Sequence, residues 1–218
     1  MIYCIGNSHV AYFAGTEKRS YFPKKENESF NELIGDDRFK LLDLGGIIAY
    51  NFIDSHMNKV YDIIKNIDKD KDYISLIAGE VDCRLHLPSQ ADKQNKSDEE
   101  TVNECAERFF ICYDKLIEMG YKVFCISTHP TTTEGHSMQD MSRPIYGNVE
   151  RRNNICVLWN RKLEELSLIR NIPFITIYNN LVDENNITKM EYFSDYCHLN
   201  SSKVINFYLD ELKKYDII

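Results

Sequence analysis

Short apolar runs alternate with amphipathic stretches along most of the chain. Five runs have the length of a strand and are apolar at successive positions, as expected for strands that helices cover on both faces. They span residues 2–5, 40–44, 73–78, 121–127 and 173–178. This pattern predicts buried parallel β-strands.

Apolar residues at three- and four-residue spacing occupy the segments between these runs, which is typical of helices that bury one face. Four such stripes lie over residues 53–64, 102–116, 155–169 and 204–212. Parallel strands need a crossover connection, and the usual crossover is a right-handed helical one. The alternation therefore predicts an α/β fold, a three-layer α/β/α sandwich with a parallel, flavodoxin-like five-stranded central sheet.

Three long polar connections interrupt this alternation, over residues 16–37, 85–100 and 129–148. Loops of this length in a compact domain are functional or mobile. For the first two, a solvated surface and a functional role both stay open. The third begins with His129 after the fourth predicted strand, and we expect it to border the ligand site.

Composition narrows the class of protein. The chain has 218 residues and a formal net charge of -8, which predicts one soluble domain over residues 1–218. The acidic balance argues against binding to nucleic-acid backbones, which requires a basic face. No signal peptide and no apolar stretch of membrane-spanning length is visible. We expect a cytoplasmic protein that binds neither nucleic acid nor membrane, and its oligomeric state stays open.

The seven cysteines lie mostly inside apolar runs and form no C-x-x-C pair. This pattern predicts reduced, buried thiols rather than disulfides or zinc ligands. Cys83 has no adjacent histidine in the sequence, so we interpret it as a buried thiol rather than a nucleophile. We expect neither a metal nor a cofactor.

Candidate chemistry follows the predicted strands, because ligands of parallel sheets bind outside the carboxyl ends of the strands. Ser8 follows the first strand, where it can cap a helix or present its hydroxyl beside an N–H that binds an oxyanion. Gly45 and Gly46 follow the second strand. Residues 79–84 follow the third and read Gly-Glu-Val-Asp-Cys-Arg.

Asp195 and His198 stand three residues apart just before the last predicted helix. A turn of this kind lets the carboxylate accept a hydrogen bond from one imidazole nitrogen and leaves the other nitrogen free as a base. Alone the pair is weakly specific, and the serine near the other end of the sequence gives it weight.

In this order the motifs resemble those of the SGNH/GDSL hydrolase superfamily, over nearly the whole chain. The matching blocks are Gly6-Asn7-Ser8, Gly45-Gly46, Gly79-Glu80-Val81-Asp82, and Asp195 with His198. The resemblance implies that Ser8 is the acyl nucleophile, His198 the general base and then acid, and Asp195 the residue that orients His198. It also implies an oxyanion hole made by the N–H groups of Ser8 and of Gly46 or Gly45.

The sequence departs from the family pattern at Val81, where members carry an asparagine that supplies a third oxyanion donor. Either the hole has two donors or a neighbour substitutes, and Arg84 is our candidate because a guanidinium carries several donors. The alternative is that Arg84 pairs with Glu80 or Asp82 and only shapes the loop.

Four further residues are candidates for substrate contact because they flank these motifs. They are His9, Glu80, Asp82 and His129. For each, a surface position or a structural ion pair is the alternative.

Together these features predict a serine esterase that removes a small acyl group, acetyl, from a carbohydrate or related hydroxylated substrate. One alternative is an O-acyltransferase that uses the same residues with a saccharide as acceptor. Another is a noncatalytic binding module, which the missing asparagine at position 81 would suit. The expected ligand in each case is a small-molecule or saccharide ester.

Overall fold

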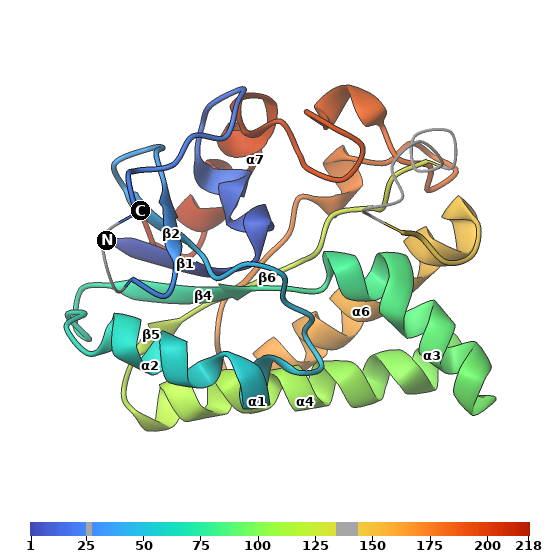
Figure 1. The fold of residues 1–218 in the computed structure, drawn as a ribbon, viewed down its shortest axis with the longest axis horizontal. Helices are drawn as coiled ribbons and strands as arrows, with labels where there is room; N and C mark the ends of the chain where they lie inside the picture. The colour runs from blue at the N-terminus through green and yellow to red at the C-terminus, as the bar shows by residue number, and fades with distance from the viewer. Residues whose placement is uncertain (25–27, 134–143) are drawn as a thin grey trace.

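The central sheet has five strands in the order β2-β3-β1-β4-β5 (Figure 1). The computed structural model describes residues 1–24, 28–133 and 144–218. The parallel strands are β1 (Ile2–Gly6), β3 (Phe39–Asp43), β4 (Tyr73–Ile77) and β5 (Lys122–Val123). Strand β2 (Asn31–Leu33) pairs antiparallel with β3 at the edge of the sheet. This edge strand was not predicted, because its short segment lies in a polar connection without a strand pattern.

The last two predicted runs form a second pairing. Strands β6 (Cys125–Ile126) and β7 (Phe174–Ile175) make a parallel two-stranded sheet. The Phe124 N–H donates to Ile74 O at 3.1 Å, whereas the next N–H, of Cys125, donates to Pro173 O at 2.9 Å. Successive N–H groups of an extended chain point to opposite sides, so this run lies between β4 and β7 and pairs only briefly with each. The prediction of five parallel strands in one sheet is therefore wrong in two details: β2 is antiparallel, and β7 belongs to the second sheet.

Six α-helices are described. They are α1 (Phe52–Ser55), α2 (Met57–Ile64), α3 (Leu87–Gln94), α4 (Asp98–Glu118), α6 (Val149–Ile169) and α7 (Ser201–Lys213). Helix α3 lies in the stretch 85–100, which was predicted to be a loop, and this prediction is wrong. Pro88 stands in the first turn of α3, where its missing N–H costs nothing, and Ser97 with Glu100 forms the capping box that starts α4.

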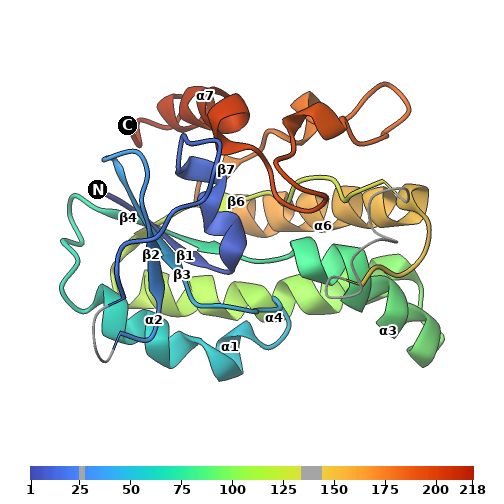
Figure 2. The same ribbon diagram turned by 45° about the horizontal axis from the view of Figure 1, so that its top comes forward.

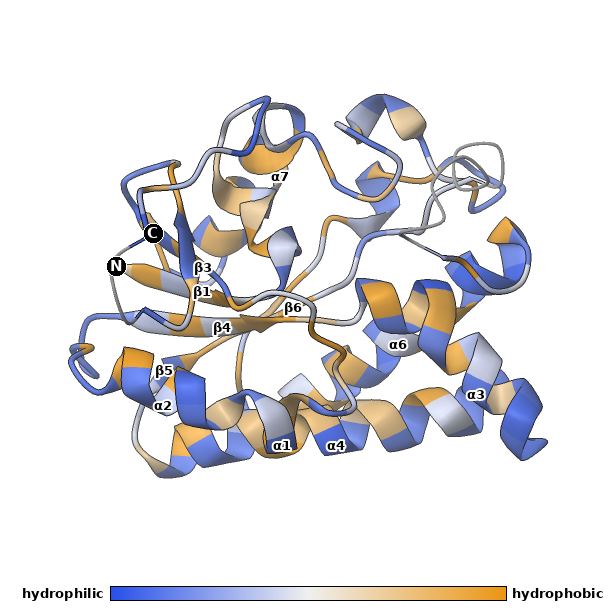
Figure 3. Ribbon diagram, in the orientation of Figure 1, coloured by the Kyte–Doolittle hydropathy of each residue, from blue (hydrophilic) through white to orange (hydrophobic). Residues whose placement is uncertain are grey.

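Side chains of each strand alternate between two hydrophobic clusters, one on each face of the sheet. Ile5, Leu42 and Ile74 belong to the cluster that includes side chains of α1, α2, α4 and α6. Cys4 and Leu41 belong to the cluster formed with α7 and the 3-10 helix η1 (Ser8–Phe13). Figure 2 shows α7 on one side of the sheet and α1, α2 and α4 on the other, and Figure 3 shows the apolar strands between them. The predicted three-layer arrangement is confirmed.

All seven cysteines are buried, and none is in a disulfide within the described residues, as the sequence predicts. No helix of the described ranges combines the length and the apolar character needed to cross a bilayer.

Candidate active site

Strand β1 ends in a turn that presents Ser8. A Cβ atom on Gly6 would lie only 2.0 Å from Ile77 O, so glycine allows the backbones of β1 and β4 to approach closely here. The next residue, Asn7, accepts the His9 N–H through Oδ1 at 3.1 Å and so caps η1. Ser8 is the first residue of η1 and therefore lies just beyond the carboxyl end of β1.

The turn before α7 is built around the Asp195 carboxylate. Oδ1 accepts the backbone N–H groups of Cys197 at 2.9 Å and of His198 at 2.8 Å. Oδ2 lies 2.8 Å from Nδ1 of the His198 ring. The carboxylate therefore holds both the backbone and the ring of His198, and the geometry assigns the Nδ1 proton to the bond with Asp195.

These two segments meet although 190 positions separate them. Ser8 Oγ lies 2.8 Å from His198 Nε2, so Ser8, His198 and Asp195 form one hydrogen-bonded chain. With Nδ1–H donating to Asp195, Nε2 accepts the Ser8 hydroxyl proton. The structure thus brings together the three residues that the sequence singled out as a triad.

The charge of Asp195 suits this arrangement. Burial acts to raise its pKa, but the hydrogen bond and charge of His198, with the N–H groups of residues 197 and 198, outweigh burial and lower the pKa. Asp195 therefore stays ionised at neutral pH, as an orienting carboxylate requires.

The loop after β3 brings two glycine N–H groups to the same end of the sheet. The Gly45 N–H donates to Asp43 Oδ1 at 2.9 Å, and Asp43 Oδ2 accepts the Tyr21 hydroxyl at 3.2 Å. Gly45 is therefore already engaged. No hydrogen bond of the Gly46 N–H occurs within the described part of the chain, which makes Gly46 the better of the two candidate oxyanion donors.

The four residues considered for substrate contact are buried. They are His9, 4% exposed, Glu80, 2%, Asp82, 0%, and His129, 1%. Their described partners are protein groups: His9 Nε2 lies 3.1 Å from Glu80 Oε2, and His129 Nε2 lies 3.4 Å from His9 Nδ1. Asp82 Oδ2 accepts the Ala49 N–H at 2.8 Å and so anchors the loop after β3. Substrate contact by these four residues therefore stays a prediction, and in the structure they form a buried hydrogen-bonded layer next to the candidate triad.

Burial dominates the electrostatics of this layer. It lowers the pKa of His9 to about 3, although the hydrogen bond and charge of Glu80 act in the opposite direction. It also lowers the pKa of His129. For Glu80, burial acts to raise the pKa, but the His9 hydrogen bond and the Arg84 charge outweigh it, and the pKa is lowered. Glu80 is therefore ionised in this buried layer.

Arg84 adopts the alternative arrangement considered for it. Its Nε donates to Glu80 Oε1 at 2.8 Å, and a terminal nitrogen donates to Pro144 O at 2.6 Å. Both side chains are buried. The guanidinium therefore shapes the segment after β4, and the expectation that it replaces the asparagine missing at Val81 is not supported.

Sequence reasoning missed Arg19. One terminal nitrogen of its guanidinium lies 3.0 Å from His198 Nε2, and the other lies 3.6 Å from Asp195 Oδ2. Arg19 belongs to the polar connection 16–37, where no periodicity or motif distinguishes it from the other charged residues. Its signal in the sequence was only a positive charge in a long loop.

Asp195, Cys197 and His198 are also the described residues whose possible metal-ligand atoms gather, within 4.8 Å of one another. The hydrogen bonds between Asp195 and His198 account for this grouping without an ion. Of the connection 129–148, residues 134–143 lie outside the described residues.

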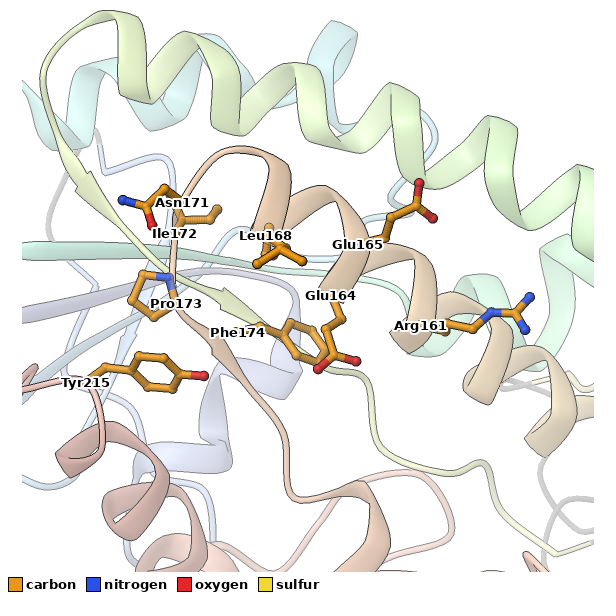
Figure 4. A pocket seen from close by; sticks show the side chains of 10 residues that line it. Arg161, Glu164, Glu165, Leu168, Asn171, Ile172, Pro173, Phe174 and Tyr215 are labelled. Atoms are coloured by element: carbon orange, nitrogen blue, oxygen red, sulfur yellow. The ribbon is translucent and has the colours of Figure 1, made fainter.

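A cavity of about 570 Å³ lies away from these residues (Figure 4). The end of α6, strand β7 and Tyr215 line it, and none of the candidate site residues reaches it. A cavity of about 340 Å³ lies beside the candidate site and is lined by Glu17, Lys18, Arg19, Tyr21 and Ser194.

Comparisons with known proteins support the fold. No family model and no curated protein matches the sequence. Among solved structures, a GDSL-like lipase from Bacteroides thetaiotaomicron is 14% identical with a TM-score of 0.55, covering 100% of this chain and 88% of the lipase. An acetylxylan esterase from Geobacillus stearothermophilus is 12% identical with a TM-score of 0.51, covering 97% and 93%. The OSK domain of Drosophila Oskar is 12% identical with a TM-score of 0.56, covering 96% and 87%. The chain therefore has the fold of the SGNH/GDSL hydrolases, which its sequence motifs resemble.

Proposed function

We propose that the protein is a serine esterase with Ser8 as nucleophile, His198 as general base and Asp195 as the residue that orients His198. The observation that carries the proposal is the hydrogen-bonded chain, with 2.8 Å from Ser8 Oγ to His198 Nε2 and 2.8 Å from His198 Nδ1 to Asp195. A serine hydroxyl is a weak nucleophile, and an adjacent oriented imidazole is what activates it.

In the proposed reaction, Ser8 Oγ attacks the ester carbonyl while its proton moves to His198 Nε2. The oxygen that becomes negative binds the N–H groups of Ser8 and Gly46. His198 then gives its proton to the leaving alcohol as the ester C–O bond breaks. Water next attacks the acyl-enzyme while its proton moves to His198, and the bond between the acyl group and Ser8 breaks as His198 returns the proton to Ser8 Oγ and the acid leaves. Two preorganised donors suffice for such a hole, and each is worth on the order of 10²–10³ in rate.

We further propose that the acyl group is a small one, acetyl, and that the alcohol is a carbohydrate or another hydroxylated molecule. The acetylxylan esterase that shares this fold supports this class of substrate. The acceptor, water or a second hydroxyl group, decides between hydrolysis and acyl transfer, because the same acyl-enzyme serves both reactions.

A noncatalytic binding role is the competing function. Val81 offers no side-chain donor, and the fold also occurs in the OSK domain of Oskar, whose name states no enzymatic activity. Activity-based labelling separates this role from the proposed one.

The test is labelling with a fluorophosphonate probe, followed by peptide mass spectrometry. We expect one adduct, on Ser8, that disappears in Ser8→Ala and persists in the control Ser202→Ala, which removes a hydroxyl that donates to Asn200 Oδ1. We expect Asp195→Asn to lower the turnover of p-nitrophenyl acetate by a factor on the order of 10⁴, because an amide stabilises the wrong imidazole tautomer. An unlabelled wild-type protein, or an adduct that survives Ser8→Ala, would refute the esterase proposal.

A further inference from the structure

The contact between Arg19 and His198 joins two groups that the proposed mechanism does not connect. An imidazole nitrogen that acts as a base has one lone pair in the plane of the ring. Two donors converge on that atom of His198: the Ser8 hydroxyl at 2.8 Å and an Arg19 nitrogen at 3.0 Å. The guanidinium therefore competes with Ser8 for the lone pair that must accept the serine proton.

Arg19 also stands where a substrate must bind. The reacting carbonyl has to lie within about 3 Å of the nucleophile and close to the base. With one nitrogen 3.0 Å from His198 Nε2, the guanidinium is at the edge of that position. An ester that enters the site must either displace Arg19 or bind to it.

The surroundings of Arg19 leave it able to change partners. Its side chain is 28% exposed, and its ion pair with Asp195 is long, at 3.6 Å. It lines the cavity of about 340 Å³ together with Lys18, so two cationic side chains border that cavity. Glu17 is the acidic side chain among the lining residues. Among the described residues, the groups that face His198 include Asp195, Ser8, Arg19, Cys197 and the ring of His9.

We propose that Arg19 binds an anionic group, a carboxylate or a phosphate, located next to the scissile ester of the substrate. This proposal rests on the esterase function proposed above and narrows its substrate class to acidic esters. When the anion binds, the guanidinium moves from the neutral His198 nitrogen to a charged partner that it can grip with two parallel hydrogen bonds. Of the two donors, only the Ser8 hydroxyl then still donates to His198 Nε2. Binding of the correct substrate therefore completes the activation of the serine.

A neutral ester offers Arg19 no charged partner in place of His198. It has to share the site with a guanidinium that still hydrogen-bonds the base. The wild-type protein should therefore prefer an anionic ester over a neutral one of the same size. A solely structural Arg19 that anchors its loop to Asp195 predicts no such preference.

The experiment compares three acetyl esters of similar size by the release of acetate: 2-acetoxyacetamide, 2-acetoxyacetate and 2-acetoxyethyl phosphate. We expect the wild-type protein to favour at least one anionic ester over the amide. Arg19→Gln should lower kcat/KM for that anionic ester by about ten- to a hundredfold, the size of one charge-assisted interaction, and should raise it for the amide. The control Lys18→Gln removes one positive charge from the same cavity without removing the contact to His198, and should reduce the preference by less than Arg19→Gln does.

Opposite shifts for the two substrates are the signature of the proposed role, because a loop anchor would lower both rates together. Equal losses for charged and neutral esters in Arg19→Gln overturn the proposal, and so does an unchanged ratio. The ester that shows the larger effect tells a carboxylate from a phosphate.

A binding measurement keeps this proposal separate from the esterase function. Calorimetric titration of Ser8→Ala with 2-acetoxyacetate and with 2-acetoxyethyl phosphate needs no turnover. Binding of either anion that weakens at least tenfold in Ser8→Ala/Arg19→Gln supports the role of Arg19, even if the esters are not hydrolysed. Absent binding, or equal binding by both variants, overturns it. If the fluorophosphonate probe labels Ser8 but the anions do not bind, or bind equally to both variants, the esterase function stands and only the anionic substrate class fails.

Discussion

At the scale of single residues, the site depends on buried groups whose partners are backbone atoms. Asp82 is the clearest case, because its Oδ2 accepts the Ala49 N–H and holds the loop that carries Gly46. Its other oxygen, Oδ1, has no hydrogen-bond partner among the described residues. Burial raises the pKa of Asp82 to about 6, with the charge of Glu80 adding to the rise and backbone N–H groups opposing it.

The first prediction concerns the pH dependence of stability at Asp82. A pKa raised from 3.8 to about 6 means that the native state binds this proton more tightly than the unfolded state. The contribution of Asp82 to the free energy of unfolding should therefore fall as pH rises from below 3.8 to above 6, by roughly 3 kcal/mol. Denaturant unfolding of the wild-type protein and of Asp82→Asn between about pH 3 and pH 8 measures this effect as the change with pH in the difference between their free energies of unfolding. A difference that stays constant with pH would contradict the raised pKa.

At the scale of elements, the segment after β4 depends on a close approach to α6. Gly79 has a φ of +112°, and a Cβ atom there would lie 2.7 Å from Nε1 of the Trp159 indole. The buried pair of Glu80 and Arg84 follows directly, so the turn, the helix contact and the ion pair are built by neighbouring residues. A side chain at position 79 would disturb all three.

The second prediction is that Gly79→Ala lowers the free energy of unfolding by about 2–6 kcal/mol, since backbone strain and overpacking each cost about 1–3 kcal/mol. Gly120→Ala is the matched control, because Gly120 also has a positive φ, +83°, but has open space where a Cβ would be. Gly120→Ala should lower the free energy of unfolding only by the cost of the backbone strain, about 1–2 kcal/mol. Denaturant unfolding compares the two, and equal losses would show that contact with Trp159 is unimportant.

The elements also show how far the sequence pattern reaches. All five apolar runs became strands, because alternation of buried side chains between two helical layers makes every position apolar. The pattern missed β2, whose residues are largely polar at the edge, and α3, whose polar composition concealed a helix with Pro88 in its first turn. Short elements at the surface bury too few side chains to show a period.

At the scale of the whole molecule, the site exists because η1 and α7 pack on the same face of the sheet. Ser201 joins them directly: its Oγ donates to Tyr12 O at 2.8 Å and accepts the Gly15 N–H at 2.7 Å. This buried hydroxyl lies three positions after His198 and connects the two ends of the chain close to the Ser8–His198 contact. The position of His198 relative to Ser8 therefore depends on hydrogen bonds of Ser201, which is not one of the three triad residues.

The third prediction is that Ser201→Ala lowers the free energy of unfolding by about 1–3 kcal/mol, because it leaves two backbone groups without a partner. It should also lower esterase turnover, since a small misplacement of His198 relative to Ser8 weakens proton transfer. Ser202→Ala is the control, because the Ser202 hydroxyl bonds only to Asn200 among the contacts described, within its own helix cap. Its stability should change by about 0.5 kcal/mol or less. Similar stability and turnover for both variants would show that Ser201 does not fix the position of His198 relative to Ser8.

The sequence by itself determined the order and type of the main elements and the identity of Ser8, Asp195 and His198 as candidates, because periodicity and strand-end position are local properties. Only the tertiary structure decided which hydrogen-bond partner each polar group around these three residues takes. Arg84 pairs with Glu80, and the Gly45 N–H with Asp43, whereas Arg19 reaches His198 from a polar loop. Such choices are made between segments far apart in the chain, where each polar side chain takes the partner that packing brings within reach, and no spacing in the sequence records that competition.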